Sequence, residues 1–295
     1  MTAEIIDGKA IAQQVRDELR PRIEALRARG IEPGLAIVLV GENPASVTYV
    51  RGKVRDCAEL GIKSETYRLP AEATQRELID LVQQINADPA WHGVIVQLPL
   101  PEQMDEEAAI ATIDPAKDVD GAHPQSQGRL LRGLLTFLPA TPAGVQQLLL
   151  RSGHPPDGRH VVICGRSNLV GKPLAALLAQ KQPDANATVT VCHTATPDLA
   201  DTTRRAEILV AAMGRPGTIT ADMAREGAVV IDVGVNSVPD SSRKSGRRLV
   251  GDVDFAAVSE KAAAITPVPG GVGPMTRAML LSNTVLAAEG GPTGP

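Results

Sequence analysis

Short apolar runs alternate with helical patterns along most of this sequence, and that alternation limits the fold more than any other feature. In the first half, the expected strands are 35–40, 63–68 and 93–98, and the expected helices are 9–29, 45–60 and 75–87. The run LAIVLV at 35–40 is apolar at every position, which is typical of a strand covered on both faces. The alternation therefore predicts parallel α/β architecture.

A second series of the same kind occupies the other half of the chain. Its expected strands are 160–164, 188–192, 208–212 and 228–233, followed by helical sequence at 278–289. We therefore expect two α/β domains with a cleft between them, the first over 1–142 and the second, Rossmann-like, over 143–273. The segment 274–289 is expected to pack back on the first domain, and the tail 290–295 to be disordered.

Composition excludes several classes of protein. Hydrophobic residues make up 43% of the chain, enough to bury a core, and the net charge of −4 gives no basic footprint for nucleic acid. No apolar run reaches the ~18 residues of a membrane helix, and no secretory signal is visible over residues 1–10. The cysteines, Cys57, Cys164 and Cys192, lack metal-ligand spacing, so we expect no metal site and a cytoplasmic protein with reduced thiols.

A glycine-bearing turn joins an apolar strand to a helix in the second series. Strand 160–164 leads into Gly165-Arg166-Ser167, and Gly171 stands just before helical sequence. Such a turn presents unpaired backbone N–H groups and the positive end of a helix to an anion. The spacing departs from the common dinucleotide fingerprint, since Ser167 stands where a second glycine would be. On this motif alone, a phosphate site and a tight turn without a ligand both remain open.

The next strand ends in Cys192-His193-Thr194, where a Rossmann domain selects between NAD and NADP. No Asp or Glu occurs there to bind a ribose diol, whereas Arg166 and Thr194 could receive a 2′-phosphate. These residues favour NADP. The alternative is that Arg166 is a solvated surface side chain.

Tyr49 and Lys53 are four residues apart on the expected helix 45–60, so they lie on one face of it. They could line a cleft with a ring for stacking and an amine for proton transfer, if burial or a nearby cation lowers the pKa of the lysine. From the spacing alone, an exposed helix face beside Arg51 and Arg55 is the better interpretation.

Polar side chains also follow the third strand of the first half. Gln97 ends that strand at a position where α/β sites are built, although capping the strand is an equal alternative. Asp118 and Asp120 alternate and so share one side of an extended segment, where one of them could hold an amidine edge such as that of a pterin. An ordinary Asp-Gly turn is the default interpretation of this pair.

Two further segments have unusual compositions. The stretch 266–276, TPVPGGVGPMT, is too rigid and too glycine-rich for a helix or strand, and favours close packing against a planar ligand over an interdomain turn. Residues 239–248 are rich in Ser, Arg and Gly and are expected to form a flexible surface loop. For their basic side chains, solvation is favoured over contact with a cofactor phosphate.

Five segments, in order, resemble those of the bifunctional methylenetetrahydrofolate dehydrogenase/methenyltetrahydrofolate cyclohydrolase family. They are SVTYVRGK at 46–53, GVIVQLPLP at 93–101, KDVDG at 117–121, GRS with VGKP at 165–173, and TPVPGGVGPMT at 266–276. The resemblance covers nearly the whole chain, to about Thr284, and five motifs in register are highly specific.

The resemblance implies a role for each candidate residue. Lys53 would be the central catalytic group, with Gln97 tuning its charge. Tyr49 would position the folate, and Asp120 would hold the pterin. The folate pocket would also include Leu98, Pro99, Pro269, Gly270 and Gly271. The NADP site would include Thr141, Gly165, Arg166, Ser167, Gly171, Thr194 and Val235.

The family activity implies that NADP⁺ takes a hydride from 5,10-methylenetetrahydrofolate, because the nitrogens beside the one-carbon bridge can stabilise the methenyl cation without a metal. Lys53, if partly neutral, would assist the addition of water that leads to 10-formyltetrahydrofolate. A homodimer is also implied. Two alternatives stay open: a dehydrogenase without useful cyclohydrolase activity, and a catalytically silent folate or nucleotide sensor.

The sequence departs from the family pattern at Ala122, Ser126 and Ala140, where Phe, Asn and Cys are usual. These positions lie beside the expected pocket. They therefore bear on substrate affinity and relative rates, not on the reaction class.

Overall fold

The computed structural model describes residues 2–243 and 246–292, which form two compact units. Unit 1 consists of Met1–Ala12 and Thr141–Thr276, and unit 2 of Gln13–Ala140 and Arg277–Pro295. The limits between the units fall within α1 (Gly8–Ala28), α6 (Ala140–Arg151) and α10 (Val272–Ala288). Each of these helices therefore contributes residues to both units.

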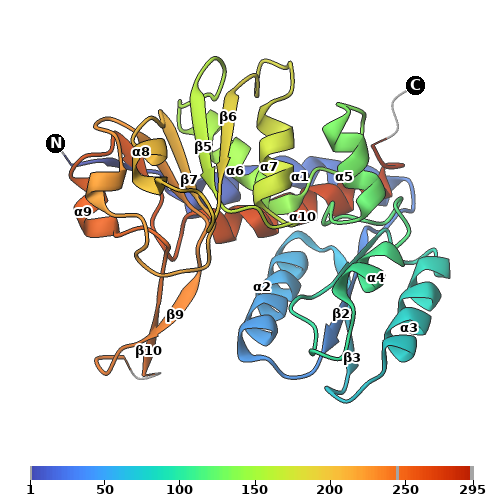
Figure 1. Ribbon diagram of the computed structural model, residues 1–295. Coiled ribbons are helices and arrows are strands. Elements are labelled where there is room, and N and C mark those ends of the chain that lie inside the picture. The colour runs from blue at the N-terminus through green and yellow to red at the C-terminus, as the bar shows by residue number, and fades with distance from the viewer. Residues whose placement is uncertain (1, 244–245, 293–295) are drawn as a thin grey trace. The chain divides into compact units, whose positions relative to one another are not determined.

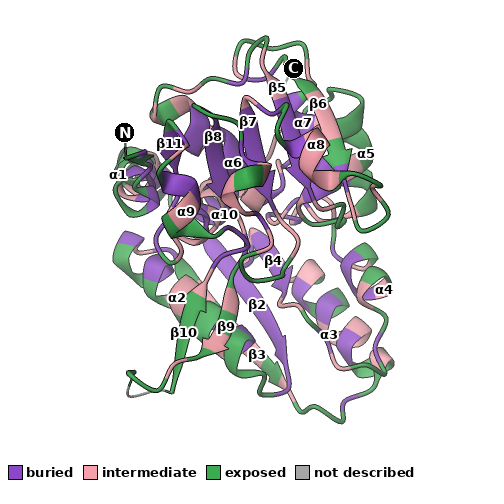
Figure 2. Cartoon of the chain, turned by 60° about the vertical axis from the view of Figure 1, so that its left-hand side comes forward, coloured by how far each residue is buried: buried purple, intermediate pink, exposed green. Residues whose placement is uncertain are grey.

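Unit 1 is built on a six-stranded parallel sheet in the order β1-β11-β8-β7-β5-β6, of which β5, β6 and β7 are labelled in Figure 1. The strands are β1 (Glu4–Ile5), β5 (His160–Cys164), β6 (Thr188–Cys192), β7 (Ile208–Ala211), β8 (Val229–Asp232) and β11 (Ala264–Ile265). Central strands β7 and β8 are buried throughout, as aliphatic parallel strands need (Figure 2). The chain passes from β5 to β6 and then to β7 on the other side of β5, so the topological switch point lies beside the end of β5.

Short helices connect these strands. They are α7 (Gly171–Leu178), α8 (Leu199–Thr203), the 3₁₀ turn η1 (Ala221–Met223) and α9 (Phe255–Ser259). The expected strands of the second series are confirmed to within a residue at each end. Strands β1 and β11, which pair with each other, were not expected, because two residues are too few to show a hydrophobic period.

The expectation of a flexible loop at 239–248 is wrong at both ends. Strands β9 (Asn236–Pro239) and β10 (Arg247–Val250) form an antiparallel hairpin, which projects from the sheet of unit 1 (Figure 1). Asp240 closes the turn by accepting hydrogen bonds from the Ser242 amide and hydroxyl. The strands are four residues each and largely face solvent, so no alternating pattern marked them in the sequence. Residues 244 and 245 lie outside the described residues.

Unit 2 contains a three-stranded parallel sheet in the order β3-β2-β4. Its strands are β2 (Gly34–Val40), β3 (Lys63–Leu69) and β4 (Gly93–Val96), and its helices include α2 (Pro44–Leu60), α3 (Gln75–Ala87), α4 (Glu106–Ala111) and α5 (Pro124–Leu131). All seven residues of β2 are buried (Figure 2). Leu35, Ile37 and Leu39 belong to one hydrophobic core, and Ala36 and Val38 to another, because successive side chains leave opposite faces of the sheet.

Local signals fix the ends of α2, and hence which of its side chains share a face. The Asn43 side chain accepts hydrogen bonds from the Ala45 and Ser46 amides, and Pro44 occupies the first turn. Gly61 ends the helix with φ +68°, a left-handed conformation that glycine adopts without strain. The helices expected in the first half are confirmed, with ends displaced by one residue at most.

The last helix begins earlier than expected, at Val272 instead of Ala278. The end of segment 266–276 is therefore helical, because Pro274 lies in the first turn, where its missing N–H costs nothing. Gly290 and Gly291 donate hydrogen bonds to carbonyls of this helix, so the start of the tail is ordered; residues 293–295 lie outside the described residues. None of the helices in the described parts of the chain is long and apolar enough to cross a bilayer.

Candidate functional site

The clearest group of reactive side chains in unit 2 centres on Lys53. Its Nζ atom donates a hydrogen bond to Gln97 Oε1 at 3.0 Å. Gln97 follows the buried strand β4 and is held in turn, since its Nε2 atom donates to the Leu98 carbonyl at 2.7 Å. The amide therefore presents its oxygen to the amine. The structure thus brings together two candidates that lie 44 residues apart in the sequence.

The pKa of Lys53 is lowered mainly by burial and is modified by neighbouring groups, with Cys57 acting in the same direction as Asp120. Burial lowers the pKa of the amine, the Asp120 carboxylate opposes this shift, and the Arg277 guanidinium adds to it. A lysine with a lowered pKa has a larger neutral fraction near neutral pH, which is what a proton-transfer group needs.

Asp118 and Asp120 have different surroundings. Asp118 is fully buried, and its two carboxylate oxygens accept hydrogen bonds from the Ala122 and His123 amides. Burial raises the pKa of Asp118 to about 6, although the hydrogen bond with Ser126 opposes the shift. Asp118 is therefore the acid that holds the Asp-Gly turn together. Asp120 is only partly buried and its charge reaches Lys53.

Tyr49 lies one helical turn before Lys53, and 37% of its surface is exposed. Burial of the rest raises the pKa of its phenol, and Arg277 opposes that shift. Nearby, the buried Ser46 hydroxyl donates to the Leu98 carbonyl at 3.4 Å, which ties the start of α2 to the segment after β4. Pro99 is exposed. An exposed ring beside a partly buried amine is suited to stacking against a planar substrate.

In unit 1, the turn after β5 is shaped by two glycines. Gly165 has φ +136°, and a Cβ atom there would lie 2.1 Å from the Ala212 carbonyl oxygen. A Cβ atom on Gly171 would lie 2.0 Å from the Gly165 carbonyl oxygen. Only glycine therefore allows this approach of strand, turn and helix. The turn lies at the topological switch point, where α/β proteins bind their ligands.

Several polar residues around this turn are exposed to solvent. Arg166, Ser167 and Thr194 are exposed, and no side chain caps the first turn of α7. Gly165 donates a hydrogen bond to the Cys192 carbonyl, so the ends of β5 and β6, with Thr194 two residues beyond, are adjacent. Backbone N–H groups at a helix start, with an arginine beside them, fit a phosphate-bearing ligand.

The remaining candidates of unit 1 lie elsewhere in it. Val235 follows β8 and is 42% exposed. The Thr141 hydroxyl hydrogen-bonds that of Thr276 at 3.0 Å. The turn Pro269-Gly270-Gly271 is closed by the Gly271 amide, which donates to the Pro267 carbonyl at 2.8 Å, and a Cβ atom on Gly8 would lie 1.9 Å from the Gly271 carbonyl oxygen. This turn is thus packed against the start of α1.

Two buried acids, which the sequence did not single out as site residues, hold the loops after β7 and β8. Asp232 accepts hydrogen bonds from the Gly234, Asp252 and Val253 amides. Asp252 accepts from the Met213 and Gly214 amides and from the Asn236 side chain. Burial raises the pKa of Asp232 to about 6. The pair fixes the backbone on both sides of Val235.

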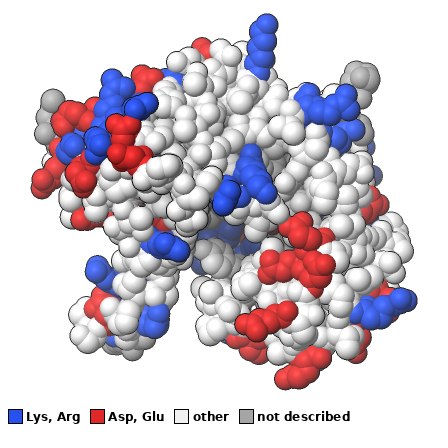
Figure 3. Space-filling model, in the orientation of Figure 1, with Lys and Arg blue, Asp and Glu red and all other residues white. Residues whose placement is uncertain are grey.

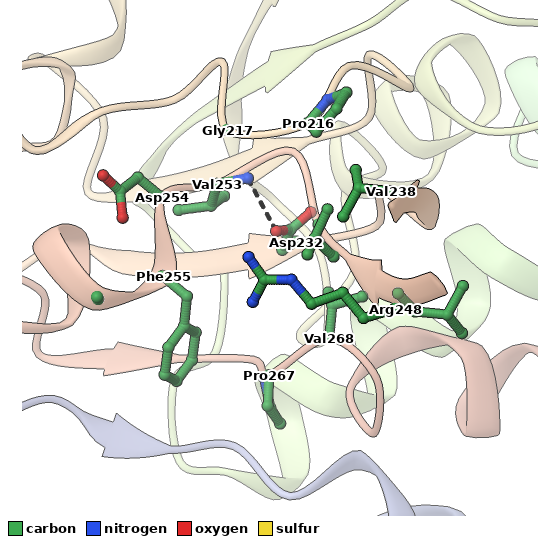
Figure 4. Close-up of a pocket in the computed structure, with 14 residues that line it drawn as sticks. Pro216, Gly217, Asp232, Val238, Arg248, Val253, Asp254, Phe255, Pro267 and Val268 are labelled. Atoms are coloured by element: carbon green, nitrogen blue, oxygen red, sulfur yellow. Dashed lines mark hydrogen bonds between the residues drawn. The ribbon is translucent and has the colours of Figure 1, made fainter. Parts of the chain in front are cut away.

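A hollow of about 630 Å³ lies beside this network, between the hairpin and α9 (Figure 4). Asp232, Arg248 and Phe255 are among its lining residues, and none of the predicted site residues is. Basic side chains are visible on the hairpin (Figure 3). Arg247 donates to the Ser237 hydroxyl at 2.7 Å, and Arg248 lies 3.7 Å from an Asp240 oxygen, so both pair within the hairpin.

Arg277 and Asp56 are two further residues that sequence reasoning missed near Lys53. Arg277 Nε donates to Asp56 Oδ2 at 2.6 Å, although 221 residues separate them. One signal was present: Arg277 is the only charged residue in the apolar sequence of α10. A lone charge in an apolar helix indicates a specific partner.

Comparison with known proteins agrees with this geometry. Residues 139–291 match the family model described as tetrahydrofolate dehydrogenase/cyclohydrolase, NAD(P)-binding domain, and residues 6–120 match the catalytic domain of the same family. The chain is 56% identical over 287 residues to the bifunctional protein FolD of Salinibacter ruber, covering 97% of this chain and 96% of the relative.

Two solved structures are similar over nearly the whole chain. The FolD methylenetetrahydrofolate dehydrogenase/cyclohydrolase of Campylobacter jejuni has a TM-score of 0.91 and 46% identity, covering 98% of this chain and 99% of that one. The enzyme of Trypanosoma brucei, solved with NADP and an inhibitor, has a TM-score of 0.92 and 42% identity, covering 98% of each chain. The chain belongs to the tetrahydrofolate dehydrogenase/cyclohydrolase family.

Proposed function

We propose that this chain oxidises 5,10-methylenetetrahydrofolate to the methenyl form with NADP⁺ and then hydrolyses that product to 10-formyltetrahydrofolate. The observation that carries the proposal is the partly buried Lys53 amine, which is hydrogen-bonded to Gln97 and lies within reach of the Asp120 charge. Membership of the family supports both activities. The domain limits at 1–142 and 143–273, and the cleft between the two domains, stay predictions.

The residues of unit 1 fit a dinucleotide phosphate. The glycine cradle at Gly165 and Gly171 leaves no room for a side chain, and α7 starts without a side-chain cap. Arg166 and Thr194 would bind the 2′-phosphate, with Ser167, Thr141 and Val235 as further contacts. NADP⁺, when bound, would supply the acceptor for the hydride.

In unit 2, Tyr49 would stack on the folate, and Asp120 would accept hydrogen bonds from the amino-pyrimidine edge of the pterin. Leu98 and Pro99 would add further substrate contacts, and the part of the turn Pro269–Gly271 of unit 1 in the folate pocket stays a prediction. Lys53, in its neutral form, would take a proton from water as it adds to the methenyl carbon. It would then give that proton to the ring nitrogen as the bond between this nitrogen and the one-carbon unit breaks, while the hydroxyl of the adduct loses its proton to solvent water and becomes the formyl carbonyl. Gln97 holds the amine at the position where these transfers occur.

The test is an assay of both steps. Purified protein given methylenetetrahydrofolate and NADP⁺ should form NADPH, with transient methenyltetrahydrofolate, and should also accelerate the decay of supplied methenyltetrahydrofolate. Turnover in the first step alone would identify a dehydrogenase without useful cyclohydrolase activity. Binding without turnover would identify a sensor. We further expect a homodimer that works in the cytoplasm, which sedimentation and cell fractionation would test.

A further inference from the structure

Arg277 contacts the face of α2 that carries Tyr49 and Lys53. Its Nε atom is bonded to Asp56, one helical turn beyond Lys53. A Cβ atom on Gly52 would lie 3.4 Å from Arg277 Cδ, so the guanidinium arm packs directly on the bare backbone of Gly52. The positive charge acts on both Tyr49 and Lys53. Arg277 therefore adjoins the residues to which we assign the substrate.

One edge of the guanidinium is fixed and the other is open. The Asp56 side chain is only 3% exposed, and its second oxygen pairs with Arg55 at 3.1 Å. Among the described residues, Nε is the one nitrogen of Arg277 that has a hydrogen-bond partner. The two terminal nitrogens of Arg277 are not fully buried, so they keep contact with solvent.

Stability alone is a weak reason for this ion pair. Taking both charges out of water offsets much of their attraction, and an apolar pair of similar volume is often no less stable. Asp56 instead does what an orienting group does, because it holds the guanidinium by Nε and leaves the terminal N–H groups aimed elsewhere. The two terminal nitrogens, held in one plane and not bonded to Asp56, have the geometry to donate two hydrogen bonds to a carboxylate.

The substrate of the proposed function carries such a group. A glutamyl tail that bears carboxylates extends from the end of the folate opposite the pterin. We assign the pterin to Asp120 and the stacking contact with the folate to Tyr49, on the face of α2 that Arg277 contacts. Of the other cations nearby, Lys53 is bonded to Gln97, and Arg55 is 71% exposed and paired with Asp56. Resting on the proposed function, we propose that Arg277, oriented by Asp56, binds a carboxylate of the glutamyl tail of the folate.

The experiment compares two substrates with and without the tail. Arg277→Leu removes the charge and keeps an apolar side chain of moderate size. In the dehydrogenase step, to which we assign no proton transfer by Lys53, KM for methylenetetrahydrofolate should rise about ten- to a hundredfold, as expected for the loss of a charge-assisted hydrogen bond, while the kcat of that step changes little. With methylenetetrahydropteroate, which lacks the glutamyl group, KM should stay the same. This split between the substrates is a readout that a merely structural residue does not give.

Two further variants keep the test decisive. Arg277→Leu alone leaves the buried Asp56 with only the exposed Arg55 as an ionic partner. The double variant Asp56→Ala with Arg277→Leu therefore removes the pair together and should show the same split. Arg22→Leu is the matched control, because Arg22 pairs with Glu289 beyond the end of α10 in the same unit, and its KM should be unchanged. Circular dichroism and thermal unfolding would verify that each variant is folded.

Three outcomes overturn the inference. KM for methylenetetrahydrofolate that stays unchanged in folded Arg277→Leu protein shows that the guanidinium does not bind the tail. An equal rise for both substrates shows that Arg277 acts on the pterin end or through the fold. A wild-type enzyme that turns over neither substrate overturns the proposed function, and this inference with it.

Discussion

Replacing Lys53 with methionine is the most direct test of the assigned chemistry. Methionine has nearly the same length as lysine but lacks the amine and its charge. The change therefore removes the 3.0 Å hydrogen bond to Gln97 Oε1 and the group that would transfer protons, while it leaves the volume almost the same.

The expected magnitudes differ sharply between stability and activity. Loss of the hydrogen bond costs about 1 kcal/mol, but an ammonium no longer has to be desolvated, so the free energy of unfolding should change by no more than about 1 kcal/mol. A positioned acid–base group contributes about 10²- to 10⁴-fold in rate, which corresponds to about 3 to 5 kcal/mol of transition-state stabilisation. Cyclohydrolase activity should fall by that factor.

The assay follows the decay of supplied methenyltetrahydrofolate over a range of pH, with calorimetric titration of NADP⁺ and thermal unfolding in parallel. In the wild type, the rate should rise with pH through the lowered pKa of Lys53, because the neutral amine is the active form. In Lys53→Met that rise should disappear, while NADP⁺ affinity and thermal stability are kept.

A matched control separates the role of this amine from the loss of any lysine in unit 2. Lys63 lies 4.5 Å from the centre of the Trp91 ring, on β3, and has no assigned part in the reaction. Lys63→Met should leave both activities as they are. A Lys53→Met enzyme with a normal cyclohydrolase rate would refute the assignment of Lys53.

Three other outcomes are expected. In steady-state assays, Arg166→Ala should raise KM for NADP⁺ about ten- to a hundredfold and change KM for NAD⁺ little. An equal rise in KM for both cofactors would show that the arginine has only a structural role. Gly171→Ala should lower the unfolding free energy of the protein by about 1 to 3 kcal/mol, because its Cβ would meet the Gly165 carbonyl at 2.0 Å, and an unchanged melting temperature contradicts this. Asp118 and Asp232 have pKa values raised to about 6, against about 3.9 when unfolded, so each favours the folded state below pH 4 and loses that contribution as pH rises through 6. Urea unfolding should therefore show that the free energy of unfolding of the wild type falls by about 2 to 3 kcal/mol per group between pH 4 and 7, relative to the Asp118→Asn and Asp232→Asn variants. A free energy of unfolding that instead rises over this pH range, relative to the variants, would show that burial does not destabilise these carboxylates.

Much of the fold could be predicted because its signals are local. Strand β2 is apolar at all seven positions and is buried at all seven, and the cap at Asn43 with the stop at Gly61 fixes α2. Once those limits are known, the spacing of Tyr49 and Lys53 determines that they share a face. The sequence did not determine whether that face is exposed; in the structure Lys53 is partly buried and donates a hydrogen bond to Gln97.

Other features depend on contacts that no local pattern reveals. The strands of the hairpin β9–β10 have four residues each and are largely exposed, so they lack the alternation by which strands are found. Asp252 lies in an ordinary Gly-Asp sequence, yet it holds the Met213 and Gly214 amides, which are 39 and 38 residues away. A buried carboxylate of this kind looks like a surface turn residue until the sheet brings the loops together.

The charge of the proposed reacting amine of Lys53 also depends on contacts between segments that are distant in the sequence. Burial lowers the pKa of this amine most, and two charged segments modify that shift: Asp120 in the Asp-Gly turn, and Arg277 in the helix that contributes to unit 2 from the far end of the chain. Gln97 after β4 holds the amine by a hydrogen bond. Each segment carries a recognisable motif or a lone charge, but the balance among them is a sum over distances that only the fold supplies. A lysine motif in a sequence therefore identifies the group that could transfer a proton, whereas the residues that make it do so near neutral pH have to be read from the structure.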